Sequence, residues 1–301
     1  MKERGLGRYS GYLFALPYLL LFGGFVILPL LYGLGLSFFR WEMLSVRPPQ
    51  FVGTANFQEA LGDSYFWRAL WATFRFMLMA VIPTVCLALF IAVGVQSAPR
   101  KRQAFYRAAF YVPTVVTISV AGILWRWFYN SEFGLFNVYL ERIGEAMPWI
   151  KNYVHLKVPW ITDARWAMPS LVLMTIWWTV GAPMITLLAG LQNISPSYYE
   201  AASLDGATPR QQFRHITLPL LRPVLLFVIV LNVIGAFQVF GQVYMITRGG
   251  PELSTRTLVQ YIYETAFNNY RMGYAAALSW LLFLMIALFS AIQFRLLREK
   301  N

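Results

Sequence analysis

The sequence is poor in charge and contains a single cysteine. Charged residues make up 13% of its 301 positions and hydrophobic residues 58%, whereas a soluble domain carries about 25% charge. Low charge with high hydrophobicity excludes an intrinsically disordered chain, and one cysteine, Cys86, cannot form a disulfide within the chain. The composition therefore predicts a polytopic helical membrane protein, in which Cys86 is a small buried apolar residue.

Sequence signatures of catalysis are absent as well. The chain has no H-E-x-x-H metal motif, no G-x-S-x-G turn and no Gly-Lys dipeptide, which a P-loop requires. Its two histidines, His155 and His215, fall in separate loops, where we expect surface residues rather than metal ligands. We therefore expect no enzyme and no cofactor in this chain, so that any ATP with its Mg²⁺ is bound by another polypeptide.

Long uncharged stretches are what the sequence has instead. Six stretches of 18 residues or more contain no Asp, Glu, Lys or Arg, and a helix needs about 20 apolar residues to cross the hydrocarbon. The first stretch is too long for the apolar part of a cleavable signal peptide. We expect an all-α membrane protein with one transmembrane domain over residues 1–301. Its six helices are expected at about 10–38, 68–97, 104–129, 166–192, 219–247 and 272–297.

Basic residues indicate the orientation of these helices. With the N-terminus in the cytoplasm, the loops richest in Lys and Arg all face inward, and Arg100-Lys101-Arg102 is the strongest marker. Both termini are then expected in the cytoplasm. The net charge of +12 is expected to face anionic lipid, because no separate basic domain offers a nucleic-acid surface.

Two arginines, Arg75 and Arg126, lie near the ends of the second and third expected helices. Each could extend its head group to the membrane surface, or line a transport pathway, since ionisable groups within the membrane are costly and usually functional.

The helix interiors carry uncharged polar groups rather than carboxylates. Proton-coupled transporters usually need an intramembrane carboxylate or histidine relay, so the absence of Asp, Glu and Lys deep in the stretches argues against that mechanism. Amides and aromatic rings suit a neutral hydroxylated solute, although they also serve helix packing. The candidates are Thr175, Trp177, Trp178 and Thr179 in the fourth helix, and Asn232, Gln238 and Gln242 in the fifth.

The segment 195–216, between the fourth and fifth helices, predicts a compact helical elbow. Pro196 suits the first turn of a short helix, which Gly206 can end in the left-handed conformation. A second helix is expected to begin with a capping box of Thr208 and Gln211, and Pro219 is expected to break the chain before the fifth helix. The elbow suits docking into a groove of a cytosolic partner, and a simple connecting loop is the alternative.

Within this segment stands a long, ungapped motif. Glu200-Ala201-Ala202, Gly206, Ile216 and Leu218-Pro219 fit the pattern E-A-A-x3-G-x9-I-x-L-P. This pattern resembles the EAA loop of the membrane subunits of binding-protein-dependent ABC importers. A second block, from Thr247-Arg248-Gly249-Gly250-Pro251 to Gly273-Tyr274-Ala275-Ala276-Ala277, is similar to the carbohydrate branch, which includes the maltose and glycerol-3-phosphate importer permeases.

The resemblance implies a type I importer permease in its minimal six-helix form. Such a chain forms half of the translocation pathway for a sugar or related polyol, in the cytoplasmic (inner) membrane of a bacterium or archaeon. The implied partners are a second homologous permease, two copies of a cytosolic ABC ATPase that binds ATP and Mg²⁺, and an extracytoplasmic solute-binding protein.

The resemblance also implies roles for individual residues. Contact with the ATPase is implied for Glu200, Ala201, Ala202, Leu204, Asp205, Gly206 and Arg210. The substrate pathway is implied for Trp178, Thr179, Asn232 and Gln238.

Two questions stay open at this level. A stand-alone secondary transporter or channel is the main alternative function, and a membrane enzyme or scaffold is the second. The long loop 129–165 could dock the binding protein or form an interfacial aromatic belt; its candidate residues are Trp149, Lys151, Tyr153, Lys157 and Trp160.

Overall fold

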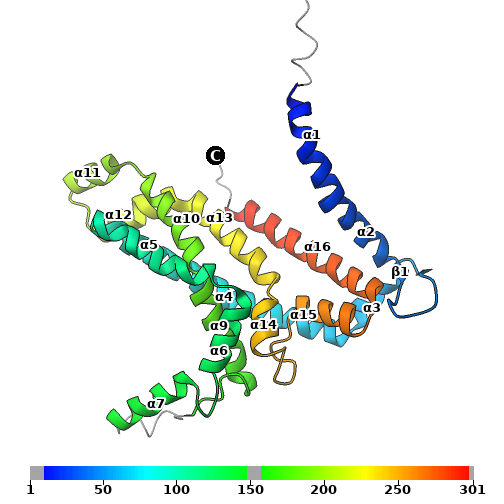
Figure 1. Cartoon of the computed structure of the whole chain (residues 1–301). Coiled ribbons are helices and arrows are strands. Elements are labelled where there is room, and N and C mark those ends of the chain that lie inside the picture. The colour runs from blue at the N-terminus through cyan, green and yellow to red at the C-terminus, as the bar shows by residue number, and fades with distance from the viewer. Residues whose placement is uncertain (1–9, 148–156, 298–301) are drawn as a thin grey trace, which may run out of the picture. The chain divides into compact units, whose positions relative to one another are not determined.

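The computed structural model describes residues 10–147 and 157–297, and these residues are mostly helical (Figure 1). The chain divides into two compact units. One unit comprises Met1–Ser64 and Ile262–Leu284, and the other Tyr65–Tyr261 and Met285–Asn301. Each unit is described by itself.

The first apolar stretch forms a continuous helical rod in the first unit (Figure 1). It consists of α1 (Ser10–Phe22), a π-helical turn η1 (Gly23–Ile27) and α2 (Leu28–Ser37). None of the most apolar 18-residue window within Phe14–Ser37 is buried inside the chain. Its apolar side chains therefore need lipid or another protein to cover them.

Polar contacts fix the short elements that follow this rod. Strand β1 (Phe39–Arg40) pairs antiparallel with β2 (Gln50–Phe51), and α3 (Ala55–Gly62) follows. The buried Asn56 donates from Nδ2 to the Ser37 carbonyl at 2.8 Å. This bond ties α3 to the end of the rod and satisfies a carbonyl that the helix end leaves without a partner.

The second segment of the first unit, Ile262–Leu284, contacts α3 and the residue after it. After the π-helical turn η3 (Glu264–Asn268), Arg271 forms an ion pair of 2.7 Å with Glu59. Helix α16 (Met272–Leu297) begins there, and Tyr274 Oη donates to Asp63 Oδ2 at 2.8 Å.

The second unit begins with most of α4 (Ser64–Ser97). A stripe of small residues, including Ala80, Thr84 and Ala88, is buried at helical spacing. Cys86 is exposed, so the expectation of a buried cysteine is wrong. The reason is periodicity, because Cys86 lies two residues from both Thr84 and Ala88 and so falls off the buried stripe.

The third expected helix, 104–129, is divided in the structure. Helices α5 (Arg100–Val115) and α6 (Ile118–Phe128) meet at a bend of 92°. Pro113 removes one helical hydrogen bond in the last turn of α5, and the surrounding β-branched residues favour extended backbone. Val116 is accordingly extended, with ψ of 131°.

The fourth expected helix, 166–192, is also bent. After α7 (Leu135–Ala146), helices α9 (Ala164–Thr179) and α10 (Gly181–Gln192) meet at 48°. Pro183 has no N–H with which to bond the Thr179 carbonyl, which weakens the helix at this point.

The fifth helix departs from expectation at both ends. Helix α11 (Pro196–Leu204) is followed by α12 (Pro209–Gln212), the π-helical turn η2 (Phe213–Thr217) and α13 (Leu218–Phe237). The last three form one continuous helix over Pro209–Phe237, so the break expected at Pro219 is wrong. The wider η2 turn absorbs the proline, because Leu218 N–H bonds back to the Phe213 carbonyl.

At its far end the fifth helix stops earlier than expected. A turn over residues 238–240 separates α13 from α14 (Gly241–Ile246), within the expected helix 219–247. The chain then reaches α15 (Leu258–Tyr263).

Small residues let the helices of the second unit approach closely. A Cβ placed on Gly181 would lie 2.5 Å from the Phe110 carbonyl oxygen and 2.8 Å from Tyr111 Cα. The backbones of α10 and α5 therefore touch at Gly181, as small residues allow between membrane helices.

Four helices are long and apolar enough to cross a membrane, and the count reaches six if each bent pair is one span. The four are Phe14–Ser37, Ser64–Ser97, Pro209–Phe237 and Met272–Arg295.

We predict that Gly181→Ala lowers stability by about 1–3 kcal/mol, because the new methyl group meets backbone that cannot rotate away. The measurement is the thermal unfolding midpoint of the purified protein in detergent. Gly94→Ala is the matched control, since the space around Gly94 in α4 is open. Equal midpoints for the two variants would contradict the close contact at Gly181.

Candidate functional site

A cavity of about 420 Å³ lies in the second unit, between α4, α5, α9, α10, α13 and α14. Among the described residues that line it, none carries a charge. Its walls are apolar with interspersed hydroxyl, amide and indole groups. The polar lining residues are Thr84, Thr114, Thr175, Trp178, Thr179, Thr186, Asn232 and Gln242.

The structure brings three of the four predicted pathway residues together. Trp178, Thr179 and Asn232 line the cavity, whereas Gln238 does not and its side chain is exposed. Gln242 takes its place, because the turn after α13 changes the helical register and directs Gln242 of α14 inward. The conformation of this turn decides which of the two glutamines faces the cavity, and the hydropathy of the sequence does not indicate that conformation.

Trp178 links the cavity wall to the bend in the third apolar stretch. Its indole Nε1 donates to the Val116 carbonyl at 2.8 Å. Val116 lies between α5 and α6, where the backbone leaves the helical conformation. A carbonyl freed at a break within the hydrocarbon must find a partner in the protein, and Trp178 supplies it.

Several hydroxyls of the cavity use their protons within their own helices. Thr175 Oγ1 donates to the Leu171 carbonyl at 2.8 Å, Thr179 Oγ1 to that of Thr175 at 2.7 Å, and Thr186 Oγ1 to that of Ala182 at 3.1 Å. Such back-bonding to the fourth preceding residue is common for threonine in helices.

The amides and the remaining hydroxyls of the cavity form fewer hydrogen bonds within the protein. Asn232 Nδ2 donates to the Val228 carbonyl at 2.8 Å, which leaves its Oδ1 free to accept. Thr114 Oγ1 is buried without a partner. Within the part of the chain that the structure describes, the side chains of Thr84 and Gln242 form no hydrogen bond. These groups remain available to a polar solute.

The elbow, residues 195–216, adopts the local conformations that its sequence predicts. Ser195 is the N-cap residue of α11, and Gly206 has a φ of +77°. Thr208 and Gln211 form the capping box at the start of α12, with Thr208 N–H donating to Gln211 Oε1 at 2.8 Å.

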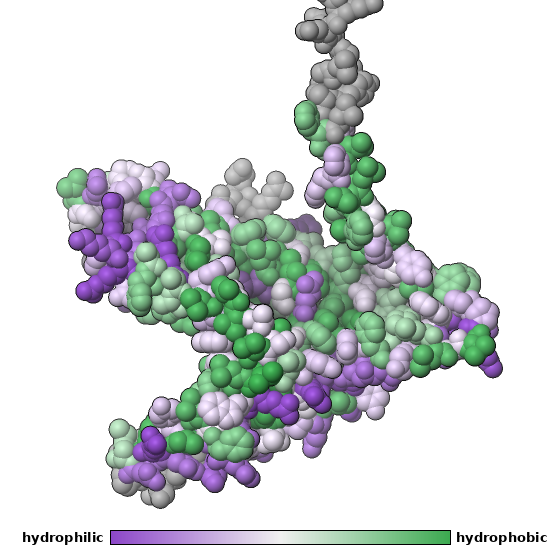
Figure 2. Space-filling view, in the orientation of Figure 1, coloured by the Kyte–Doolittle hydropathy of each residue, from purple (hydrophilic) through white to green (hydrophobic). Residues whose placement is uncertain are grey.

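Side-chain bonds close the elbow on itself. Tyr199 Oη and Thr217 Oγ1 lie 2.9 Å apart, and Gln212 Nε2 donates to Ser203 Oγ at 2.8 Å. Hydrophilic residues gather in Figure 2 at the end of the second unit where α11, α12 and the start of α5 lie. Leu204 is nevertheless 89% exposed on this surface. The other predicted coupling residues are exposed too, apart from the half-buried Ala202: Glu200, Ala201, Asp205, Gly206 and Arg210.

The sequence leaves the roles of Arg75 and Arg126 open. Neither residue lines the cavity. Arg75 Nη2 donates to the Ser254 carbonyl at 3.0 Å, so this side chain holds the loop between α14 and α15. Arg126 is exposed on α6 and borders a separate polar hollow with Asn130 and Glu132.

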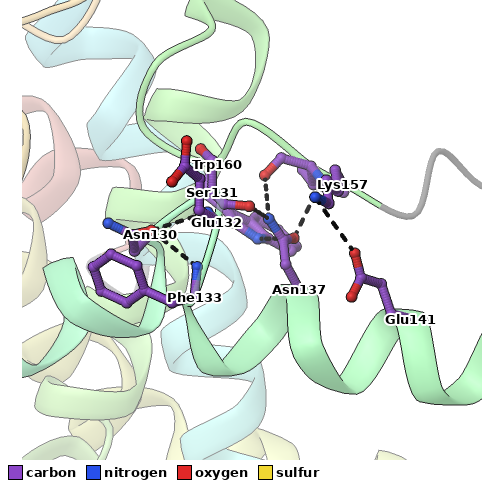
Figure 3. Close-up of polar contacts among 9 residues, drawn as sticks. Asn130, Ser131, Glu132, Phe133, Asn137, Glu141, Lys157 and Trp160 are labelled. Atoms are coloured by element: carbon purple, nitrogen blue, oxygen red, sulfur yellow. Dashed lines mark hydrogen bonds and ion pairs between the residues drawn. The ribbon is translucent and has the colours of Figure 1, made fainter.

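The loop after α6 is held by the amide of Asn137 (Figure 3). Asn137 Nδ2 donates to the Ser131 and Val158 carbonyls at 3.0 and 3.1 Å, and Oδ1 accepts from Trp160 Nε1 at 2.8 Å. Lys157 lies 4.0 Å from Glu141. The predicted residues Trp149, Lys151, Tyr153 and His155 lie outside the described residues.

Trp160 packs within the protein as well. Its ring lies 5.8 Å from the rings of both Tyr129 and Phe136, and Trp125 completes this aromatic cluster. Throughout the described ranges, no three His, Cys, Asp or Glu side chains are grouped so that they could hold a metal ion.

Apolar helices around an uncharged polar cavity, with a polar elbow at one end, define a polytopic membrane protein suited to pass a polar solute. Residues 66–299 match the family described as "Binding-protein-dependent transport system inner membrane component", and the chain belongs to this family. It is thus a non-catalytic permease component of an importer, not a stand-alone transporter or a membrane enzyme.

Two permease proteins are similar in sequence to nearly the whole chain. The sequence is 36% identical over 300 residues to the probable ABC transporter permease protein YesP of Bacillus subtilis, covering 98% of this chain and 93% of that protein. It is 33% identical over 306 residues to the lactose transport system permease protein LacF of Rhizobium radiobacter, covering 100% and 99%.

The fold also matches a solved structure. A chain of a bacterial ABC transporter involved in the import of the acidic polysaccharide alginate superposes with a TM-score of 0.83. The sequences are 21% identical, and the match covers 98% of each chain.

We predict that Trp178→Phe frees the Val116 carbonyl at a cost of about 1–3 kcal/mol, because a buried acceptor loses its donor. The measurement is amide hydrogen exchange over residues 114–118, which should become faster. Trp177→Phe is the matched control, since within the described structure the neighbouring indole N–H forms no hydrogen bond. Unchanged exchange in Trp178→Phe would contradict the bond's role at the bend.

Proposed function

We propose that this chain is one of two permease subunits of an ATP-driven importer for a sugar or related polyol. The uncharged polar cavity carries this proposal, because hydroxyl-bearing solutes need hydrogen-bond partners and an aromatic face but no countercharge. Relatives named for lactose and arabinooligosaccharide transport support the class of cargo.

The cavity is proposed as this chain's half of the translocation pathway. Its volume of about 420 Å³ lies within the usual range of small-molecule sites, roughly 300–1,000 Å³. Trp178, Thr179 and Asn232 would contact the cargo, together with Gln242. A second homologous permease would complete the pathway.

We propose six membrane spans with both termini in the cytoplasm. Each bent pair, α5 with α6 and α9 with α10, would cross the membrane once. The basic start of α5 and the elbow would then lie on the cytoplasmic side, where anionic lipid favours positive charge. The loop after α6 would face the extracytoplasmic binding protein.

The elbow is proposed to dock into a cytosolic ABC ATPase, present in two copies, which binds the ATP and Mg²⁺. Leu204 supports this, because so large an apolar side chain at 89% exposure gains from burial by a protein partner. The continuous helix Pro209–Phe237 supports it too. A displacement of the elbow would move α13 and its cavity residue Asn232 as one body.

We predict that Glu200→Lys and Gly206→Asp abolish ATP-driven uptake without preventing membrane insertion. Glu200→Lys reverses an exposed charge at the docking surface. Gly206→Asp disfavours a backbone with φ of +77° and adds a carboxylate there. The measurement is co-purification of the ATPase with the tagged chain in mild detergent, beside uptake in cells.

Ser197→Asp is the control for added charge. It places a carboxylate in the first turn of α11, where the helix dipole favours it, and should retain the ATPase. Normal uptake by Gly206→Asp, or a wild-type chain that purifies alone, would contradict the proposed function.

The proposed topology makes a separate prediction. In a Cys86→Ser background, a membrane-impermeant maleimide should label Glu132→Cys in intact cells. It should label Ser197→Cys only after the membrane is permeabilised, because the elbow lies inside. Labelling of both cysteines from the same side would contradict the proposed six spans.

A further inference from the structure

We infer that the cargo of this importer is an uncharged polyhydroxylated compound, and not an anionic sugar such as a uronate, a sulfonate or a phosphate ester. This inference rests on the proposed function and makes its cargo specific. It comes from the direction of the hydrogen bonds around the cavity.

The cavity offers no countercharge in the described structure. Its lining residues are all neutral, and Arg75, which is not among them, donates to the Ser254 carbonyl. An anion in this half of the pathway would lose its water without gaining a cation from this chain, which is strongly unfavourable.

Three of the five threonine hydroxyls that line the cavity face the cargo as acceptors. Thr175, Thr179 and Thr186 each donate their proton to a carbonyl of their own helix, so only oxygen lone pairs remain for a solute. A sugar hydroxyl can donate to these oxygens. The oxygens of a carboxylate, sulfonate or phosphate dianion cannot donate, and they would be repelled.

Trp178 strengthens the same preference. Its N–H is already bound to the Val116 carbonyl, so the indole cannot donate to an anion. Its half-buried ring remains as a flat apolar surface in the cavity wall. Stacking on such a ring suits the C–H face of a sugar.

Gln242 is the residue that we assign to cargo selection. It is 8% exposed and lines the cavity, and its amide can both donate to and accept from a hydroxyl. If Gln242 contacts a neutral solute, replacing it by an acidic or by a basic residue should impair transport. If it contacts an anion, a basic residue should be tolerated or should improve transport.

The test uses the complex co-purified from its native host and reconstituted in liposomes. The binding protein is first screened against a panel of neutral oligosaccharides and their uronate, sulfonate and phosphate counterparts, and the best-bound compound is radiolabelled. ATP-dependent uptake is then measured for Gln242→Glu and Gln242→Lys, with Gln242→Met as the uncharged reference.

The inference expects a neutral compound to bind, and expects both charged variants to lower the initial uptake rate about tenfold or more relative to Gln242→Met. Gln58→Glu and Gln58→Lys, on the exposed face of α3, should transport normally. Co-purification of the ATPase checks assembly of every variant. If either Gln242 variant fails to assemble, Asn232→Asp and Asn232→Lys make the same comparison.

An anionic cargo, with uptake preserved or raised by Gln242→Lys and lowered by Gln242→Glu, would overturn this inference and leave the proposed function intact. A complex without ATPase, or without ATP-dependent uptake of any compound in the panel, would overturn the proposed function itself, and this inference with it.

Discussion

The continuous helix from Pro209 to Phe237 is the element on which the rest of the second unit depends. It begins in the elbow and ends beside the cavity, although it contains Pro219 and Pro223, and a proline weakens an ordinary helix interior. Pro209 occupies the first turn, where no N–H is needed, and the wide η2 turn precedes Pro219. One continuous helix therefore joins the surface of the elbow to the cavity wall.

Where helices do break, the protein itself supplies the missing hydrogen bonds. The bend between α5 and α6 frees the Val116 carbonyl, which Trp178 satisfies from α9. Within hydrocarbon a broken helix is stable only where protein or enclosed water covers the freed groups. The bend and the cavity therefore belong together, because the residue that stabilises the bend also forms the wall.

Local rules predicted two features of the segment 195–216, and apolar length predicted long helical segments. The turn at Gly206 and the capping box at Thr208 depend on neighbouring residues alone, so the sequence contains all the information that they need. The bend at Val116 and the continuity through Pro219 depend on tertiary packing and on a π turn, which a hydropathy window does not detect. The sequence could not tell Gln238 from Gln242 for the same reason, because a three-residue turn changes the register of everything after it.

The exposed apolar surfaces of the chain need cover that the chain itself does not supply. The rod of α1 and α2 buries none of its most apolar 18-residue window within the chain. Lipid alone could cover these apolar side chains. Leu204 is different, because it stands on a hydrophilic elbow. Water is a poor environment for such a side chain, and lipid does not suit the exposed Glu200, Asp205 and Arg210 around it. A protein groove that is apolar at its centre and polar at its rim satisfies both requirements, and this is the surface that a docking ATPase would have to present.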